Sequence, residues 1–240
     1  MQVPTRPLFK PSSVIPGFEK LIHEPIPSGT ILLAGPPGSG KSTFTGQFLA
    51  EGLKRGEPCL AVVTDMPPAH LIRSLEERWL VEARLVRKLR ILDCYSWRLG
   101  MPSQKQEYPV VGNLTALMVE IEKLRREMKR GRLALDSLST LALDSGLQAA
   151  REFFNSLRAR MLEGEMLSLV TLEQEVHTLA FERTLSYLAE NVIKLKLIEE
   201  KGRIKRYIRV LSSRVAHSTS WFPYEVTDRG FLIRGGVIGV

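Results

Sequence analysis

The sequence predicts a single α/β domain built on a twisted, mainly parallel sheet flanked by helices. Short, continuous apolar runs alternate with segments of helical periodicity, as expected for buried parallel strands joined by crossover helices. With 240 residues, of which 44% are hydrophobic, the chain can form one sizeable core, and collagen, disordered and disulfide-scaffold classes are excluded. The runs interpreted as buried strands are residues 31–34, 59–63, 90–93, 133–136 and 167–171.

Helical periodicity fills most of the gaps between these runs. The segments with apolar residues at helical spacing are 44–53, 71–79, 114–128 and 147–161. The last fifty residues differ, because 192–198 and 204–211 mix apolar with basic residues on either side of a turn sequence. This pattern predicts an antiparallel hairpin, and further strands are expected over 222–226 and 231–234.

Composition and the N-terminal residues argue against membrane and secreted classes. Four prolines in the first sixteen residues disfavour helix, so we expect an extended arm over 1–16 and one globular domain over 17–240. No apolar run approaches the roughly 18 residues of a membrane span, and the arm has no secretory signal. Cys59 and Cys94 lie in apolar contexts, which favours buried free thiols and a cytoplasmic location, with a disulfide left open. The net charge of +8 is compatible with a polyanionic partner without requiring one.

A glycine-rich turn after the first apolar run carries the chemistry. Residues 35–42 fit the phosphate-binding pattern G-x-x-x-x-G-K-[ST] and precede an amphipathic helix. Glycines let successive N–H groups face an anion, Lys41 can reach the β- and γ-phosphates, and the Ser42 hydroxyl suits Mg²⁺. The residues expected to contact the nucleotide are Gly35, Pro36, Pro37, Gly38, Ser39, Gly40, Lys41, Ser42 and Thr43.

Two carboxylates are expected beside this loop. Asp136 ends the apolar run 133–136, where it can orient the Mg²⁺ hydration shell together with Ser42. Ser137 stands where an AAA+ enzyme would carry a glutamate, and no arginine-rich lid of the adenylate kinase type is present. Asp65 follows the strand after the phosphate-loop helix, next to the expected phosphates, which is the RecA-like arrangement.

The order of these pieces resembles the single-domain KaiC-like branch of the RecA/RadA superfamily, especially its archaeal members. The resemblance covers residues 15–234. It includes the entry into the first strand at 17–21 and 26–30, the strand ends at 92–96 and 169–173, the Walker B segment at 135–139, and the closing segments 189–195 and 224–230.

The resemblance implies an ATP- and Mg²⁺-binding core that assembles into homo-oligomeric rings, often hexamers, with nucleotide at the subunit interfaces. Glu173 or Gln174 would sense the γ-phosphate, and Arg214 would neutralise phosphate charge in the neighbouring subunit. Ser212 replaces the family's lysine in that segment, and His217 comes one residue early. The family also carries two adjacent glutamates where this chain has Thr64 and Asp65.

Three functions stay open at the level of the sequence. The first is a slow Mg·ATPase in which Asp65 helps to position water, because a displaced base can lose about a hundredfold in rate. The second is a nucleotide-gated regulatory or scaffold protein with vestigial hydrolysis and an unidentified protein partner. The third is a recombinase paralogue that binds single-stranded DNA, favoured by the net charge but disfavoured by the expected loops 144–148 and 174–184, whose only cation is Arg183. The preference between ATP and GTP is open as well.

Overall fold

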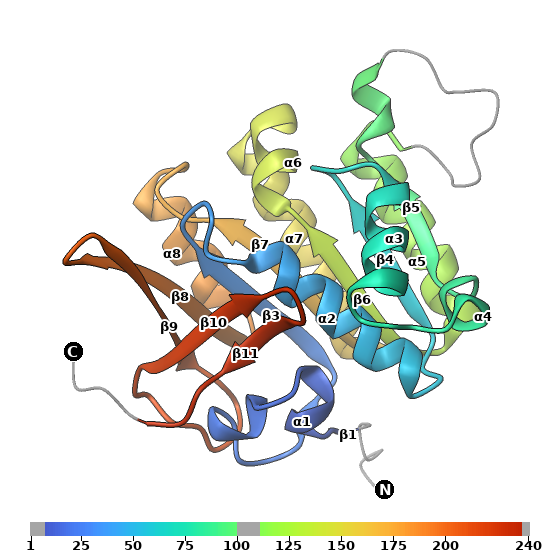
Figure 1. Cartoon of the computed structure of the whole chain (residues 1–240). Helices are drawn as coiled ribbons and strands as arrows, with labels where there is room; N and C mark the ends of the chain where they lie inside the picture. Colours follow the sequence, from blue (N-terminus) through green and yellow to red (C-terminus); the bar gives the residue numbers. More distant parts are fainter. Residues whose placement is uncertain (1–7, 100–110, 237–240) are drawn as a thin grey trace, which may run out of the picture.

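A nine-stranded sheet forms the centre of the molecule (Figure 1). The computed structural model describes residues 8–99 and 111–236. The strand order is β11-β10-β9-β8-β3-β7-β6-β4-β5. The six strands that pair in parallel are β3 (Gly29–Gly35), β4 (Cys59–Val63), β5 (Arg90–Asp93), β6 (Arg130–Asp136), β7 (Glu165–Glu173) and β8 (Asn191–Glu200). All five predicted buried strands are therefore present, and the predicted mainly parallel sheet is confirmed.

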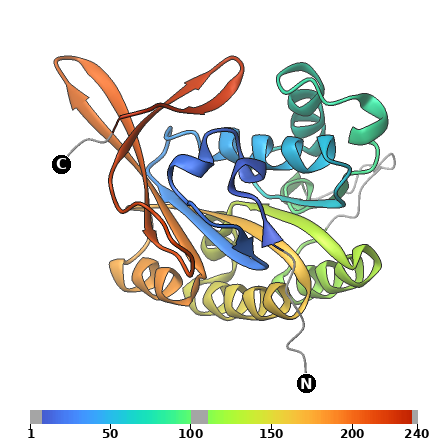
Figure 2. The same ribbon diagram turned by 90° about the horizontal axis from the view of Figure 1, so that it is seen from below.

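Helices cover both faces of this sheet (Figure 2). The face that carries the phosphate-loop helix is covered by α1 (Pro11–Val14), the 3₁₀ turn η1 (Phe18–Lys20), α2 (Lys41–Lys54), α3 (Pro68–Glu77) and α4 (Ala83–Val86). The opposite face is covered by α5 (Leu114–Met128), α6 (Leu138–Ser145), α7 (Leu147–Glu163) and α8 (Leu179–Leu188). A second 3₁₀ turn, η2 (Ser96–Leu99), follows β5. The strands are buried on both sides, which explains their continuous apolar sequences.

The C-terminal strands are antiparallel, as predicted. β9 (Arg203–Ser212) pairs with β8, and β10 (Phe222–Thr227) joins β9 to β11 (Gly230–Ile233). The short β10–β11 hairpin then folds over α2, because Phe231 contacts Phe44 at a ring-centroid distance of 5.2 Å. The end of the chain thus lies over the helix that follows the phosphate loop.

The expected extended arm differs from the structure over its described part. β1 (Leu8–Phe9) pairs with β2 (Ile26–Pro27), and α1 begins with a proline in its first turn, the helical position that proline tolerates. Val14 and Ile15 are fully buried in the core. Residues 8–16 therefore belong to the domain, whereas 1–7 lie outside the described residues.

The two loops expected after the fourth and fifth strands are also largely helical. The first is occupied by the end of α6 and the start of α7, and the second contains the first half of α8. The hydroxyls of Ser137 and Thr178 accept hydrogen bonds from the N–H groups of Thr140 and Phe181, so each caps a helix that the periodicity did not reveal.

The cysteine prediction is confirmed for this structure: Cys59 and Cys94 are buried thiols that form no disulfide. Burial raises the pKa of the Cys59 thiol to about 12. Within the described ranges, no helix has both the length and the apolarity needed to cross a bilayer.

Candidate nucleotide-binding site

The glycine-rich loop leaves β3 at the carboxyl end of the sheet and turns directly into α2. Gly38 and Gly40 have positive φ angles of 74° and 88°, which L-residues with side chains rarely adopt. A Cβ on Gly40 would also lie 2.6 Å from the Val226 side chain. The first N–H groups of α2 have no partner within the helix and face the loop, which makes this end of α2 suited to an anion.

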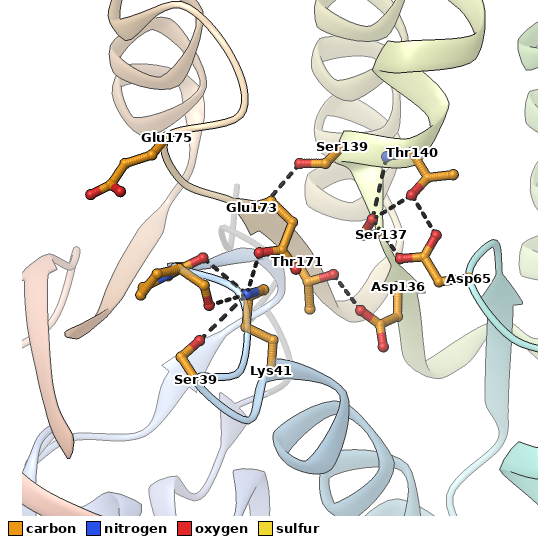
Figure 3. A network of polar contacts seen from close by, with 12 residues as sticks. Ser39, Lys41, Asp65, Asp136, Ser137, Ser139, Thr140, Thr171, Glu173 and Glu175 are labelled. Carbon is orange, nitrogen blue, oxygen red and sulfur yellow. Dashed lines mark hydrogen bonds and ion pairs between the residues drawn. The ribbon is translucent and has the colours of Figure 1, made fainter. Parts of the chain in front are cut away.

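The Lys41 side chain is held inside the loop (Figure 3). Its Nζ donates to the carbonyl oxygens of Gly35 and Pro36 at 2.9 and 2.8 Å and forms an ion pair with Glu173 Oε2 at 2.8 Å. The Lys41 side chain is only 4% exposed. The amine is therefore already surrounded by oxygen atoms, and a phosphate would have to replace at least one of them.

Glu173 is fixed by its place at the end of β7. Its N–H donates to Ser139 Oγ at 2.8 Å, and the N–H of Gln174 donates to the Gly35 carbonyl at 3.0 Å. Of the two residues expected to sense the γ-phosphate, the structure thus brings the Glu173 carboxylate to the lysine of the phosphate loop. Gln174 is tied to the loop by its backbone.

Asp136 ends β6 and Ser42 is the last residue of the phosphate-loop pattern. The two lie side by side, as predicted from these positions. Asp136 accepts a hydrogen bond from the Thr171 hydroxyl at 2.6 Å, and the Ser42 hydroxyl lies close to the same carboxyl group. Burial raises the pKa of the Asp136 carboxyl, although the hydroxyls of Thr171 and Ser42 oppose the shift. A buried carboxylate and a hydroxyl are hard oxygen ligands of the kind Mg²⁺ prefers, and a divalent cation would offset the desolvation of Asp136. The residues therefore fit this ion.

Asp65 lies next to Asp136, across the ends of β4 and β6 (Figure 3). Its Oδ1 accepts from Thr64 Oγ1 at 3.0 Å and from the Thr140 hydroxyl, and its Oδ2 accepts from Ser137 Oγ at 3.0 Å. The carboxylate is exposed to solvent but already accepts three hydroxyl hydrogen bonds. Its position therefore agrees with the predicted one, while its oxygens are largely engaged.

Arg214 lies far from the phosphate loop of its own chain. It contacts Glu190 Oε1 at 3.4 Å, and the other oxygen of Glu190 accepts the N–H of Thr30 at 2.9 Å. Thr30 precedes Gly35 by five residues on β3, so the strand separates these two residues by about 16 Å, at 3.3 Å per residue. The Arg214 side chain is 52% exposed, and it does not reach the phosphate loop of its own chain.

Several polar groups of the site were missed by the sequence reasoning. Thr171, Ser137 and Thr140 surround the two aspartates, and Tyr224 from β10 donates its hydroxyl to the Ser39 carbonyl at 2.6 Å. Hydroxyl residues are common and carry no spacing signature. Only the position of Ser137 directly after Asp136 could have pointed to its role.

Together, the parallel sheet and the loop beside two carboxylates define a RecA-like nucleotide-binding protein of the P-loop class. The family model described as "ATPase: KaiC" matches residues 12–235 of the chain. The chain belongs to this KaiC family of ATPases.

Known relatives agree with this assignment. A UPF0273 protein of Thermotoga maritima is 30% identical over 227 residues, covering 91% of this chain and 93% of that protein. The circadian clock oscillator protein KaiC of Parathermosynechococcus lividus is 30% identical over 239 residues, which are 95% of this chain but 43% of that protein. Among solved structures, a KaiC-like protein from Pyrococcus horikoshii superposes with a TM-score of 0.76 at 25% identity, covering 95% of this chain and all of that one.

Proposed function

We propose that the protein binds Mg·ATP at residues 35–43 and hydrolyses it slowly at the subunit interfaces of a homo-oligomeric ring. The observation that carries the proposal is the juxtaposition of Lys41, Ser42 and Asp136 around the anion-binding end of α2. Lys41 would bind the β- and γ-phosphates, and Ser42 and Asp136 would hold Mg²⁺. Mg²⁺ held by these two residues would supply positive charge that offsets the charge of the phosphates.

Slow turnover is proposed from the environment of Asp65. A general base needs a free lone pair within reach of the proton that it removes. Three hydroxyl hydrogen bonds occupy most of the acceptor sites of Asp65, and Thr64 offers no carboxylate. Asp65 would then position water through its hydroxyl neighbours more than it would remove a proton.

Turnover by purified protein tests this proposal. We expect slow, magnesium-dependent release of phosphate from ATP, abolished in Lys41→Ala and reduced about tenfold or more in Asp65→Ala, as is typical of the loss of a group that positions the nucleophile. Rapid hydrolysis that survives Asp65→Ala would contradict the role given to this carboxylate.

A nucleotide-gated switch with vestigial hydrolysis is the second candidate. The ion pair between Lys41 and Glu173 favours it, because nucleotide binding would release a side chain at the end of β7 and thereby alter the loop before α8. In that case ATP changes the oligomeric state or partner binding without measurable turnover. Measuring size and phosphate release on the same sample separates the two functions.

A further inference from the structure

Arg78 links the phosphate-binding helix to the C-terminal hairpin. It directly follows α3, and its guanidinium reaches the turn between β10 and β11. The Nη2 and Nε groups donate to the carbonyls of Thr227 and Asp228 at 2.7 and 3.1 Å, and Nη1 contacts the Thr43 hydroxyl at 3.4 Å. Three segments far apart in the sequence thus meet at one side chain.

The positive charge of Arg78 has no acidic partner in the described part of the chain. Its hydrogen-bond acceptors are two carbonyls and a hydroxyl, and its guanidinium lies 5.6 Å from the centre of the Trp79 ring. By contrast, Arg73 on α3 pairs with Glu77 at 3.0 Å. A cation that is half-buried without a carboxylate is a site where an anion would be favourable.

A cavity of about 120 Å³ extends from Arg78 to Ser42 and Asp136, the proposed magnesium ligands. Ser42, Thr43 and Asp136 line it together with Arg78 and Trp79. Thr43 lies in the first turn of α2, whose N–H groups would face the α- and β-phosphates in a phosphate loop. The uncompensated charge of Arg78 is therefore next to the position that these phosphates would occupy.

We propose that Arg78 is a positioning residue of the nucleotide site, which supplies positive charge beside the first turn of α2 and fixes the Thr43 hydroxyl there. This inference rests on the proposed function, since it needs a nucleotide at residues 35–43. The β10–β11 turn holds the guanidinium through two carbonyls, so the hairpin becomes part of the site. Removing the charge should weaken binding of ADP and ATP alike, because Thr43 is not at the γ-phosphate end.

Two substitutions separate charge from packing. Arg78→Gln keeps a polar side chain but removes the charge, and Arg78→Lys keeps the charge without the forked geometry. Arg73→Gln is the matched control, because Arg73 is an exposed arginine on α3, the helix that precedes Arg78. A charge effect is screened by salt, whereas the loss of a packing contact is not, so each titration is run at about 0.05 and 0.5 M salt.

The test measures binding of Mg·ATP and Mg·ADP by calorimetry, with thermal melts to confirm that each variant is folded. We expect Arg78→Gln to weaken both nucleotides about tenfold at low salt and less at high salt, as befits a charge-assisted interaction. Arg78→Lys should recover most of the affinity, and Arg73→Gln should match the wild type.

Two results would overturn the inference alone. One is wild-type affinity in Arg78→Gln while Lys41→Ala loses binding. The other is an equal loss in Arg78→Gln and Arg78→Lys that does not change with salt, which would make Arg78 a structural clamp only. Absence of nucleotide binding by the wild type would overturn the proposed function, and this inference with it.

Discussion

Lys41 has two competing sets of partners. In the structure its amine binds two loop carbonyls and the Glu173 carboxylate, whereas a bound nucleotide would offer phosphate oxygens. Because Lys41 is buried, exchanging one anionic partner for another avoids leaving its charge uncompensated. In the proposed complex, Glu173 would therefore compete with the phosphates for the Lys41 amine.

Replacement of Glu173 by glutamine should raise the affinity for Mg·ATP by about fivefold, the equivalent of a partly exposed ion pair of about 1 kcal/mol. Titration calorimetry measures the effect. Glu175→Gln is the matched control, because Glu175 is exposed and points away from Lys41 (Figure 3). Weaker binding in Glu173→Gln would show that the carboxylate orients Lys41 for phosphate instead of competing with it.

The charged residues of the site could be predicted from the sequence, and their hydroxyl partners could not. Asp136 ends one apolar run and Asp65 follows another after a single residue, so the parallel sheet brings them to one edge. The contact between Thr171 and Asp136 depends instead on which strands are neighbours, and the strand order is not contained in local patterns.

At the scale of elements, strand β10 supports the phosphate loop from the side. The Tyr224 ring stacks on Phe231 at a centroid distance of 4.2 Å, and its hydroxyl binds the Ser39 carbonyl. Burial raises the pKa of this phenol, which therefore stays protonated and donates. The loop conformation thus depends on a strand almost two hundred residues further along the chain.

Tyr224→Phe should lower the free energy of unfolding by about 1 kcal/mol, because the Ser39 carbonyl loses its buried donor. For a chain of this size the loss corresponds to about 2–4 °C in Tm, measurable by calorimetry. Tyr187→Phe is the control, since Tyr187 is 87% exposed on α8. An unchanged Tm in both variants would mean that β10 does not stabilise the loop.

Elements marked by a continuous apolar run or by helical spacing of apolar residues were predicted correctly. Elements that depend on capping residues or on tertiary contacts were not. The central strands are buried on both faces, so their apolar runs identify them. Helices α6 and α8 follow the carboxyl ends of β6 and β7 and begin at hydroxyl caps. The N-terminal segment was mistaken for an arm because proline counts do not reveal that Val14 and Ile15 are buried.

At the scale of the whole molecule, the nucleotide site and Arg214 lie toward opposite ends of the strands. One subunit cannot bring them together, whereas a ring in which each subunit contacts the next in the same way can. Ion pairs with Arg158 and Arg214 hold Glu190 at the end far from the loop. This separation supports the proposed contribution of Arg214 to a neighbour's nucleotide.

Mixing two inactive variants tests this arrangement. Lys41→Ala should abolish turnover and Arg214→Ala should lower it about tenfold or more, since each lacks a group that stabilises phosphate charge. Mixed rings should recover part of the activity, because some interfaces combine Lys41 of one subunit with Arg214 of another. Arg234→Ala, which removes a half-exposed arginine paired with Glu225, should stay active. No recovery in rings shown to be mixed would contradict action between subunits.

The central claim is that the loop at residues 35–42 binds the triphosphate of a nucleotide. Calorimetric titration of the purified protein with Mg·ATP measures this directly. The Lys41→Ala variant, shown by thermal melts to be folded, is titrated in parallel. The account predicts saturable heat with about one nucleotide per chain in the wild type and a loss of binding in the variant, since Lys41 contacts the phosphates. Absence of heat in the wild type, or equal binding by Lys41→Ala, would contradict it.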